Sequence, residues 1–380
     1  MMRKVGTRDN YGQRRKQALS RRDFLKVSGI AVASTILKSQ ITYSNFENSD
    51  TSGPPLRYLA DRIIGPYERL FRIGTYLEPG ELWDPTGFHE AFAGEQFNSR
   101  VISNVGLSNY VGPNQWDFWW PDEVVLRAQA ANQSMFAHHL IWHLDIPDWI
   151  KNGGYSRAEL ITIIENHITT AMTRYKGVIR GYVVVNEHFL DDYDWFQANI
   201  GPDYLDIAFE KARQVDPDAF LIYNHFNNHV SYHPEYTITL NDVNHLKSGG
   251  LVDGVGVQFH HWSPERPRPT KQEVIPTLQS YGLPVWITEF DVFQNPEEID
   301  PEQEQAAQTK AMLEAAFESG ACDYFNIWGL NDKYSYAPEQ KLGILDENNR
   351  VKLNYYAIQQ VLADNITLVH DAFFPLITKY

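Results

Sequence analysis

Short apolar runs alternate with longer helical stretches along most of this chain, and that alternation constrains its fold more than any other feature. The runs are rich in β-branched and aromatic residues, and several are apolar at every position, which is typical of strands buried on both faces of a parallel sheet. Helical stretches such as 202–214 and 301–319 separate them. We expect the strands near residues 70–76, 100–104, 135–142, 180–186, 219–224, 252–258, 284–289 and 323–328.

Eight strands that alternate with helices predict an α/β fold of the (βα)8 TIM-barrel class in a single domain. We assign residues 61–380 to this catalytic domain, 39–60 to a linker rich in Ser, Asn, Pro and Gly, and 1–38 to a signal segment. Barrels of this class carry their active sites at the C-terminal ends of the strands, so polar residues that follow the apolar runs are expected to converge.

The signal segment carries a pair of arginines before a short apolar stretch. Ser20-Arg21-Arg22-Asp23-Phe24-Leu25-Lys26 precedes the stretch from Val27 to Leu37, which is too short to span a bilayer comfortably. This order resembles a bacterial Tat export signal, so we expect the Tat translocase as a partner and an extracellular, periplasmic or cell-surface location. A basic disordered tail and an uncleaved anchor are the alternatives.

Charge and cysteine content narrow the possible partners. The chain has a net charge of −15; residues 1–26 carry nine Lys/Arg and two Asp/Glu, a net +7, which leaves −22 on the remainder. So acidic a body argues against nucleic acid and against an anionic membrane surface as partners. The single cysteine, Cys322, excludes an intrachain disulfide and is expected to be a buried, inert thiol. We expect a monomer.

Two apolar runs end in a glutamate. Gly181-Tyr182-Val183-Val184-Val185-Asn186-Glu187 is the first, and Leu283-Pro284-Val285-Trp286-Ile287-Thr288-Glu289 is the second. A carboxylate at the end of a buried strand is costly unless it serves a function. Two carboxylates at the mouth of one barrel can flank a bond, which is the arrangement used in glycoside hydrolysis. Structural ion pairs are the alternative reading of both residues.

Six segments in chain order resemble those of glycoside hydrolase family 10, the retaining endo-β-1,4-xylanase family. The resemblance covers most of the chain, from Phe71 to Ile358, and its combination of motifs is specific. The segments are Ala137-His138-His139-Leu140-Ile141-Trp142-His143, Val184-Val185-Asn186-Glu187, Ile200-Gly201-Pro202-Asp203-Tyr204 through Tyr223-Asn224, Asp253-Gly254-Val255-Gly256-Val257-Gln258-Phe259-His260, Ile287-Thr288-Glu289-Phe290-Asp291, and Trp328-Gly329-Leu330-Asn331-Asp332-Lys333.

The resemblance implies a role for each matching residue. Glu187 is expected to be the general acid and then the general base, with a pKa raised by partial burial and by its like-charged partner. Glu289 is expected to be the nucleophile, with the two carboxyls about 5–5.5 Å apart. His260 and Asp291 are expected to orient Glu289. The expected substrate-binding residues are Asn104, His138, Trp142, Asn186, Gln258, Trp328 and Tyr336. Xylan or a xylan-derived oligosaccharide is the expected substrate, and no cofactor is expected.

The chain departs from the family pattern at positions that bear on the substrate. The family's sugar-binding lysine falls on Leu107, its second closing tryptophan on Tyr336, and its threonine after His138 on His139. Loss of a hydrogen-bond donor can reject a substrate that relied on it. We therefore expect the family mechanism to be retained, with weak activity on plain xylan or with a different β-glycoside as substrate.

Two other classes of function are the alternatives. His225, His229 and His233 are spaced i, i+4, i+8, as three metal ligands on one helix face would be, although the surrounding residues read as a loop. A non-catalytic carbohydrate-binding barrel is the second alternative, but both candidate carboxylates are present here. We expect no metal site.

Overall fold

The structure, a computed structural model, describes residues 51–191, 193–261 and 268–367. The signal segment 1–38 and most of the linker lie outside these residues. Within the described part, the chain folds into two compact units. The first comprises residues 100–224 and 245–253, and the second comprises residues 51–99, 225–244 and 254–367.

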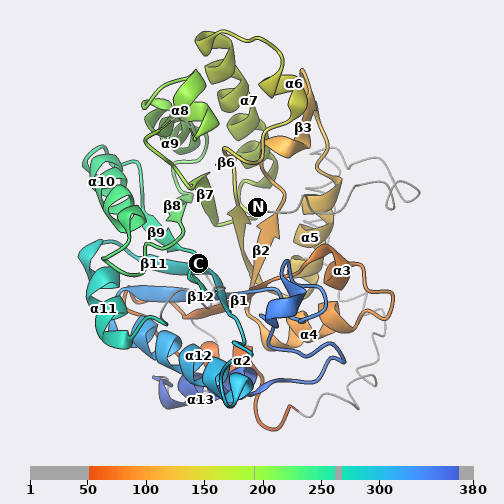
Figure 1. The fold of residues 1–380 in the computed structure, drawn as a ribbon. Coiled ribbons are helices and arrows are strands. Elements are labelled where there is room, and N and C mark those ends of the chain that lie inside the picture. Colours follow the sequence, from red (N-terminus) through yellow and green to blue (C-terminus); the bar gives the residue numbers. More distant parts are fainter. Residues whose placement is uncertain (1–50, 192, 262–267, 368–380) are drawn as a thin grey trace. The chain divides into compact units, whose positions relative to one another are not determined.

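The first unit is built around the strands β2, β5, β7 and β8, which neighbour one another in that order. The β5–β7 and β7–β8 pairs are parallel. Its elements are β2 (Ser99–Ser103), η3 (Leu107–Asn109), β3 (Tyr110–Gly112), β4 (Gln115–Trp116), α5 (Trp119–Ala130), β5 (Ser134–His138), β6 (Ile141–Trp142), α6 (Asp148–Lys151), α7 (Arg157–Tyr175), β7 (Gly181–Asn186), α8 (Trp195–Asn199), α9 (Tyr204–Val215) and β8 (Phe220–His225). The helices α7 and α9 pack against each other (Figure 1).

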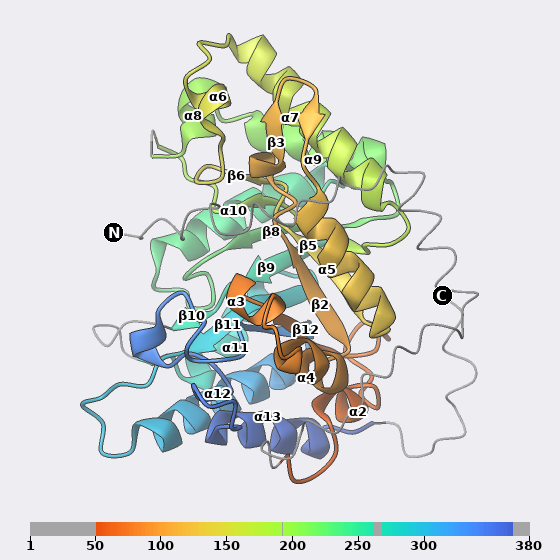
Figure 2. The ribbon, with the colours of Figure 1, turned by 90° about the vertical axis from the view of Figure 1, so that its right-hand side faces the viewer.

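The second unit is built around β9, β11, β12 and β1, which form parallel pairs in that order. Its elements are α2 (Leu56–Ala60), β1 (Arg72–Tyr76), α3 (Pro79–Leu82), α4 (Phe88–Gln96), α10 (Pro234–Ser248), β9 (Gly254–Val257), β10 (His260–His261), α11 (Lys271–Ser280), β11 (Val285–Val292), α12 (Pro301–Glu318), β12 (Cys322–Trp328), η4 (Pro338–Gln340) and α13 (Leu353–Asp364). The helices α12 and α13 lie side by side (Figures 1 and 2).

Each predicted strand is present, and at least one helix follows each strand along the chain. The two runs that end in glutamates are β7 and β11, and every residue of both strands is buried. Continuous burial is the reason that these runs are apolar on successive residues rather than on alternate ones. The predicted helices 202–214 and 301–319 are α9 and α12. The described part of the chain therefore contains the eight βα repeats that the sequence predicted.

Local sequence signals explain where the long helices begin. Ser156 and Glu159 form a capping box at the start of α7, in which each side chain bonds the backbone of the other residue. At α12, the Asp300 side chain accepts a hydrogen bond from the Gln303 N–H, and Pro301 occupies the first helical position. Such caps satisfy backbone donors that a helix start leaves unpaired.

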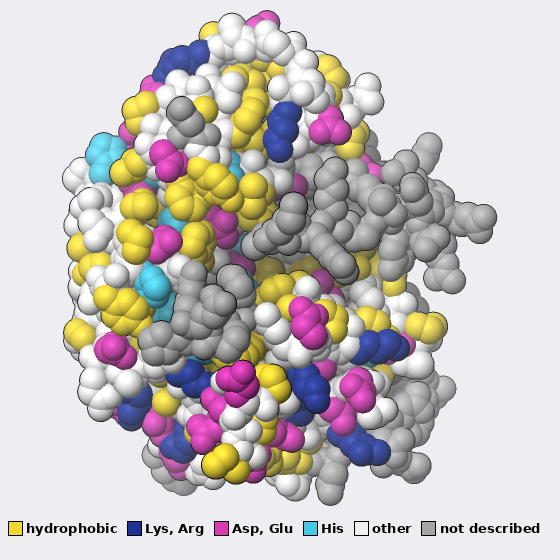
Figure 3. Space-filling view, viewed as in Figure 1, with side chains coloured by type: hydrophobic (Ala, Val, Ile, Leu, Met, Phe, Trp, Pro, Cys, Tyr) yellow, Lys and Arg dark blue, Asp and Glu magenta, His cyan; other side chains and the backbone are white. Residues whose placement is uncertain are grey.

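Charged side chains of both signs lie on the surface (Figure 3), whereas the single thiol is buried. Figure 3 shows Asp and Glu side chains interleaved with Lys and Arg on one face of the second unit, around α12. Cys322 is buried, and burial raises the pKa of its thiol to about 12, so the thiol is inert as predicted. Among the described residues, no helix has both the length and the apolarity that a membrane crossing requires.

Candidate active site

Glu187 follows directly after β7, and its conformation is set by neighbours in the first unit. Its φ of +57° lies in the left-handed region, which is uncommon for a residue other than glycine and is often found at functional sites. The Glu187 N–H donates to the Asn224 carbonyl (2.9 Å), so the turn is fixed to the end of β8. The Trp142 Nε1–H donates to Glu187 Oε2 (2.9 Å). The half-buried carboxyl group of Glu187 is thus oriented by an indole donor.

A buried amide pair lies beside Glu187. The β-sheet register places Trp142 opposite Asn186 and Asn186 opposite Asn224. The Asn224 Nδ2–H donates to Asn186 Oδ1 (2.7 Å), and both side chains are buried. This bond determines which way the Asn186 amide faces, because its oxygen is committed to Asn224. The sequence singled out Asn186 as a sugar ligand but gave no sign of this bond.

The other predicted residues of the first unit occupy different environments. His138 ends β5 and is buried, with its ring centroid 5.0 Å from that of His139. Asn104 is exposed with φ of +57°, and its carbonyl accepts from the Asn109 side chain. Leu107 begins η3 with only 1% of its surface exposed. Leu107 is therefore part of the packed interior of its unit.

Glu289 belongs to a chain of contacts in the second unit. Glu289 and Asp291 are two residues apart on β11, so their side chains leave the strand on the same side. His260 of β10 is opposite Asp291 and lies between the two carboxyls. Its Nδ1 is 2.6 Å from Asp291 Oδ2, and its Nε2 is 3.1 Å from Glu289 Oε2. Both carboxylates are buried. The structure thus brings together the three residues that the sequence grouped around the nucleophile.

The charge state of His260 follows from these contacts. Burial by itself lowers the pKa of the imidazole, but the charges and hydrogen bonds of Asp291 and Glu289 outweigh it and raise the pKa to about 10. Both ring nitrogens face carboxylate oxygens, and only the imidazolium can donate from both. At neutral pH, His260 therefore holds a positive charge against Glu289 and Asp291.

Aromatic residues surround the chain of contacts Asp291–His260–Glu289, which is called the relay below. Trp328 ends β12 and stacks on Tyr76, with ring centroids 4.3 Å apart. The Tyr336 hydroxyl donates to Asp291 Oδ2 (2.7 Å), whereas its ring is exposed. Gln258 is buried, and its N–H donates to the His225 carbonyl (3.1 Å). The bond from Tyr336 to Asp291 was not expected, since the sequence placed Tyr336 among the sugar ligands only.

The sequence interpretation missed a third carboxyl group, which lies near Trp328. Glu78 follows β1, and Tyr76, whose ring stacks on Trp328, directs its hydroxyl toward Glu78 Oε2 (3.4 Å). Burial raises the pKa of Glu78 to about 8, with the negative charge of Glu81 adding to the effect. Glu78 is therefore mostly protonated at neutral pH. The signal was available, because the rule of polar residues at strand ends applies equally to the first strand.

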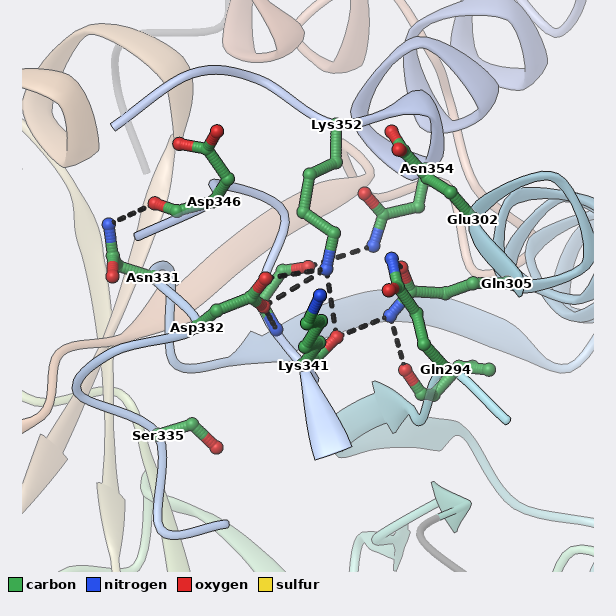
Figure 4. Close-up of polar contacts among 12 residues, drawn as sticks. Gln294, Glu302, Gln305, Asn331, Asp332, Ser335, Lys341, Asp346, Lys352 and Asn354 are labelled. Carbon is green, nitrogen blue, oxygen red and sulfur yellow. Dashed lines mark hydrogen bonds and ion pairs between the residues drawn. The ribbon is translucent and has the colours of Figure 1, made fainter. Parts of the chain in front are cut away.

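The segment after β12, residues 329–343, holds Tyr336 in place and is called here the β12 loop. Lys352 Nζ donates to both Asp332 carboxyl oxygens (2.9 and 3.1 Å) and to the Lys341 carbonyl (2.8 Å), as Figure 4 shows. Asp332 also accepts the Gly343 N–H (2.9 Å). Both ends of the β12 loop are therefore tied to one buried ion pair.

The three histidines that formed the alternative metal site are not arranged on a helix. His225 ends β8, whereas His229 and His233 lie in the segment between β8 and α10. The ring of His229 stacks on Phe259, with centroids 4.3 Å apart. Within the residues that the structure describes, no group of three or more His, Cys, Asp or Glu side chains is placed to hold a metal ion.

Comparison with known proteins decides the family. The model of glycosyl hydrolase family 10 matches residues 65–361. The chain belongs to this family. Endo-1,4-beta-xylanase A of Phanerodontia chrysosporium is 32% identical over 275 residues, which are 70% of this chain and 67% of that protein. Endo-1,4-beta-xylanase B of Thermotoga neapolitana is 28% identical over 341 residues, which are 85% of this chain and 95% of that protein.

Solved structures agree with the family assignment. Xylanase 10B from Thermotoga petrophila RKU-1, crystallised with xylobiose, superimposes with a TM-score of 0.74 at 26% identity, over 83% of this chain and 99% of that chain. The predicted fold class is confirmed, and this family 10 protein is a (βα)8 barrel. It is a glycoside hydrolase that acts on O-glycosyl bonds.

Proposed function

We propose that this family 10 protein hydrolyses xylan or xylan-derived oligosaccharides by double displacement, with Glu289 as nucleophile and Glu187 as acid/base. The observation that carries the proposal is the contact of Glu289 with His260 at the end of β11, where an imidazolium donates a hydrogen bond to the carboxylate and orients it. The relatives described as endo-1,4-beta-xylanases support the choice of substrate.

The first step forms a covalent glycosyl-enzyme. Glu289 attacks the anomeric carbon while the bond to the leaving oxygen breaks, and Glu187 gives that oxygen a proton. In the second step Glu187 takes a proton from water, the water oxygen attacks the same carbon, and the bond to Glu289 breaks. Two inversions return the original anomer. This chemistry requires the two carboxyls to be about 5–5.5 Å apart, which stays a prediction.

The contacts of each glutamate suit its proposed role. The Trp142 indole binds one carboxyl oxygen of Glu187 and can hold the group in one orientation. The other oxygen of Glu187 can then serve the leaving group. Glu289 accepts a hydrogen bond from His260, which holds the carboxylate in one orientation for attack. Asn186, fixed by Asn224, can direct its amide N–H group at a sugar hydroxyl next to the reacting carbon.

Product analysis tests the proposal. The full-length chain is incubated with a panel of β-linked polysaccharides and aryl β-glycosides that includes linear xylan, and first-formed products are assigned by NMR. We expect xylo-oligosaccharides in the β-configuration, at a lower rate on plain xylan than typical family members show. Glu289→Ala is expected to lower kcat on the order of a thousandfold or more. Glu210→Ala, on the exposed face of α9, is the matched control.

Each other outcome has a defined meaning. Cleavage of another β-glycoside with xylan untouched keeps the mechanism and changes the substrate. Cleavage of plain xylan at ordinary family rates contradicts the expected effect of the Leu107 departure. Activity that survives Glu289→Ala overturns the assignment of the nucleophile, and inactivity across the panel, together with sugar binding, favours the non-catalytic barrel.

A further inference from the structure

Asp291 is surrounded by donors from three directions. Its Oδ2 accepts from His260 Nδ1 (2.6 Å) and from the Tyr336 hydroxyl (2.7 Å). Its Oδ1 accepts from the His261 N–H (3.1 Å). The His260 and His261 contacts come from β10, next to β11, whereas Tyr336 belongs to the β12 loop. Tyr336 is thus the contact that ties the carboxylate to a separate part of the second unit.

The Tyr336 side chain is divided between two environments. Tyr336 as a whole is 47% exposed, but its hydroxyl donates to Asp291, a residue that is 2% exposed. The ring also lies edge-on to His260, with centroids 5.7 Å apart. Burial of the hydroxyl, with the charges of Asp291 and Glu289, raises the pKa of Tyr336 well above its ordinary value. The phenol therefore stays a neutral O–H donor throughout the pH range in which glycosidases work.

The β12 loop keeps the hydroxyl at this place without help from a substrate. The buried pair Asp332–Lys352 and the Lys352–Lys341 bond close the loop on both sides of Tyr336 (Figure 4). Gln305 Nε2 of α12 also donates to the Lys341 carbonyl (2.8 Å). A donor on so firmly held a loop is pre-organised, so little conformational freedom is lost when it orients its partner.

We propose that Tyr336 is a positioning residue for the nucleophile, acting through its hydroxyl on Asp291 and from there through His260 on Glu289. The proposal rests on Glu289 being the nucleophile. The family pattern has a tryptophan at this position. A tryptophan has an indole N–H but no hydroxyl, so it cannot donate to Asp291 through an O–H group as Tyr336 does. The ring remains available to sugars, but the hydroxyl serves the relay.

Removal of the hydroxyl has a defined electrostatic consequence. Without the Tyr336 donor, Asp291 attracts the Nδ1 proton of His260 more strongly, and the imidazole becomes a weaker donor toward Glu289. A weaker hydrogen bond to the ionised form of Glu289 raises the pKa of that carboxyl. The acid limb of the kcat/KM profile should therefore move to higher pH. The groups that face His260 in the described structure are Asp291, Glu289, Tyr336 and Trp328, and the substitution changes only one of them.

Tyr336→Phe tests the inference on the best substrate of the panel. We expect kcat to fall about tenfold with KM changed less than about twofold, and the acid limb to rise by several tenths of a pH unit. Tyr336→Trp, which keeps a large aromatic ring, is expected to share the loss of kcat. Tyr58→Phe is the matched control, since that tyrosine of α2 is similarly exposed and its ring contacts the Arg62 guanidinium.

The outcomes separate the inference from the proposed function. If Glu289→Ala abolishes hydrolysis but Tyr336→Phe has the kcat and pH profile of the wild type, the inference is wrong and the function stands. A higher KM in Tyr336→Trp, with kcat and pH profile unchanged in both variants, shows a sugar contact instead. If Glu289→Ala remains active, the proposed function fails first. Thermal unfolding of each variant confirms that the comparison is between folded proteins.

Discussion

Individual buried residues decide what this family 10 enzyme can do, and their surroundings set their charge. Glu289 faces an imidazolium, whereas Glu78 meets another carboxyl and a tyrosine, and burial raises its pKa to about 8. A glutamate therefore meets a cationic partner in one place and is kept mostly neutral by burial in the other. Both glutamates lie at or near the end of a strand, so position in the sequence alone does not predict their different surroundings.

Leu107 is the residue whose interpretation changes most between sequence and structure. The family pattern predicts a lysine there that reaches a sugar, but the side chain is 1% exposed and packed. We expect Leu107→Lys to reduce the free energy of unfolding by about 2 kcal/mol or more, because an ammonium group would be buried without a partner. Urea unfolding measures the loss, and Leu107→Met, of similar volume, is expected to cost less than about 1.5 kcal/mol.

Activity gives the Leu107 substitution a second readout. Since the side chain is in the packed interior, Leu107→Lys is expected not to raise the rate on linear xylan. A variant as stable as the wild type and faster on xylan would contradict the structure at this position, because it would mean that residue 107 opens toward the sugar.

At the scale of elements, the strands and long helices could be predicted and the short elements could not. The buried strands β7 and β11 carry continuous apolar runs, and α7 begins at a capping box, so each has a local signal. The two-residue strands β6 and β10 have no periodicity, because so few residues cannot repeat a pattern. Those short strands place Trp142 and His260. The contact of His260 with Glu289 was expected from the family resemblance, whereas the bond from Trp142 to Glu187 was not.

The β12 loop shows how a segment with little regular structure is held. Lys352 and Asp332 are each 5% exposed and paired with each other. Burial lowers the pKa of Lys352 and raises the pKa of Asp332, and the contact between them opposes both effects. A pair of this kind is costly to break by removal of one partner, since the other charge is left buried and alone.

Lys352→Met tests this anchoring. We expect it to lower the free energy of unfolding by about 3–5 kcal/mol, and the double variant with Asp332→Asn to lose less than the single one. Urea unfolding of the two single variants and the double variant gives the coupling energy. A cost below about 1 kcal/mol for Lys352→Met would show that the pair does not hold the loop. Lys333→Met, in the same loop but outside the pair, serves as the control.

At the scale of the whole molecule, each compact unit holds one of the two proposed catalytic glutamates together with that residue's own partners. The first unit supplies Glu187 with Trp142, and the second supplies Glu289 with His260. Each carboxyl is thus oriented by residues of its own unit. The fold class could be predicted because the βα alternation extends over the chain, and His260 could be predicted as a partner of Glu289 from the family resemblance. The bond from Trp142 to Glu187 could not, since it joins residues that are distant in sequence.

The N-terminal segment is basic, whereas the remainder of the chain is acidic. Residues 1–26 carry a net +7 against −22 on the remainder, and the twin arginines Arg21 and Arg22 fall within the basic part. We propose export by the Tat translocase, which transports folded proteins. A chain whose single cysteine is a buried thiol needs no disulfide formation outside the cytoplasm before it can fold.

Replacement of both Arg21 and Arg22 by lysine tests the route of export without changing the net charge. In bacterial cells that have a Tat translocase, we expect the wild type in the exported fraction and the double variant in the cytoplasm, as measured by fractionation and glycosidase assay. The same change at Arg14 and Arg15 is the control, because it alters an arginine pair of the same segment that is further from the apolar stretch. Export of the Arg21/Arg22 variant at the rate of the wild type would show that the arginine pair is not read as a signal and that the basic segment acts through charge alone.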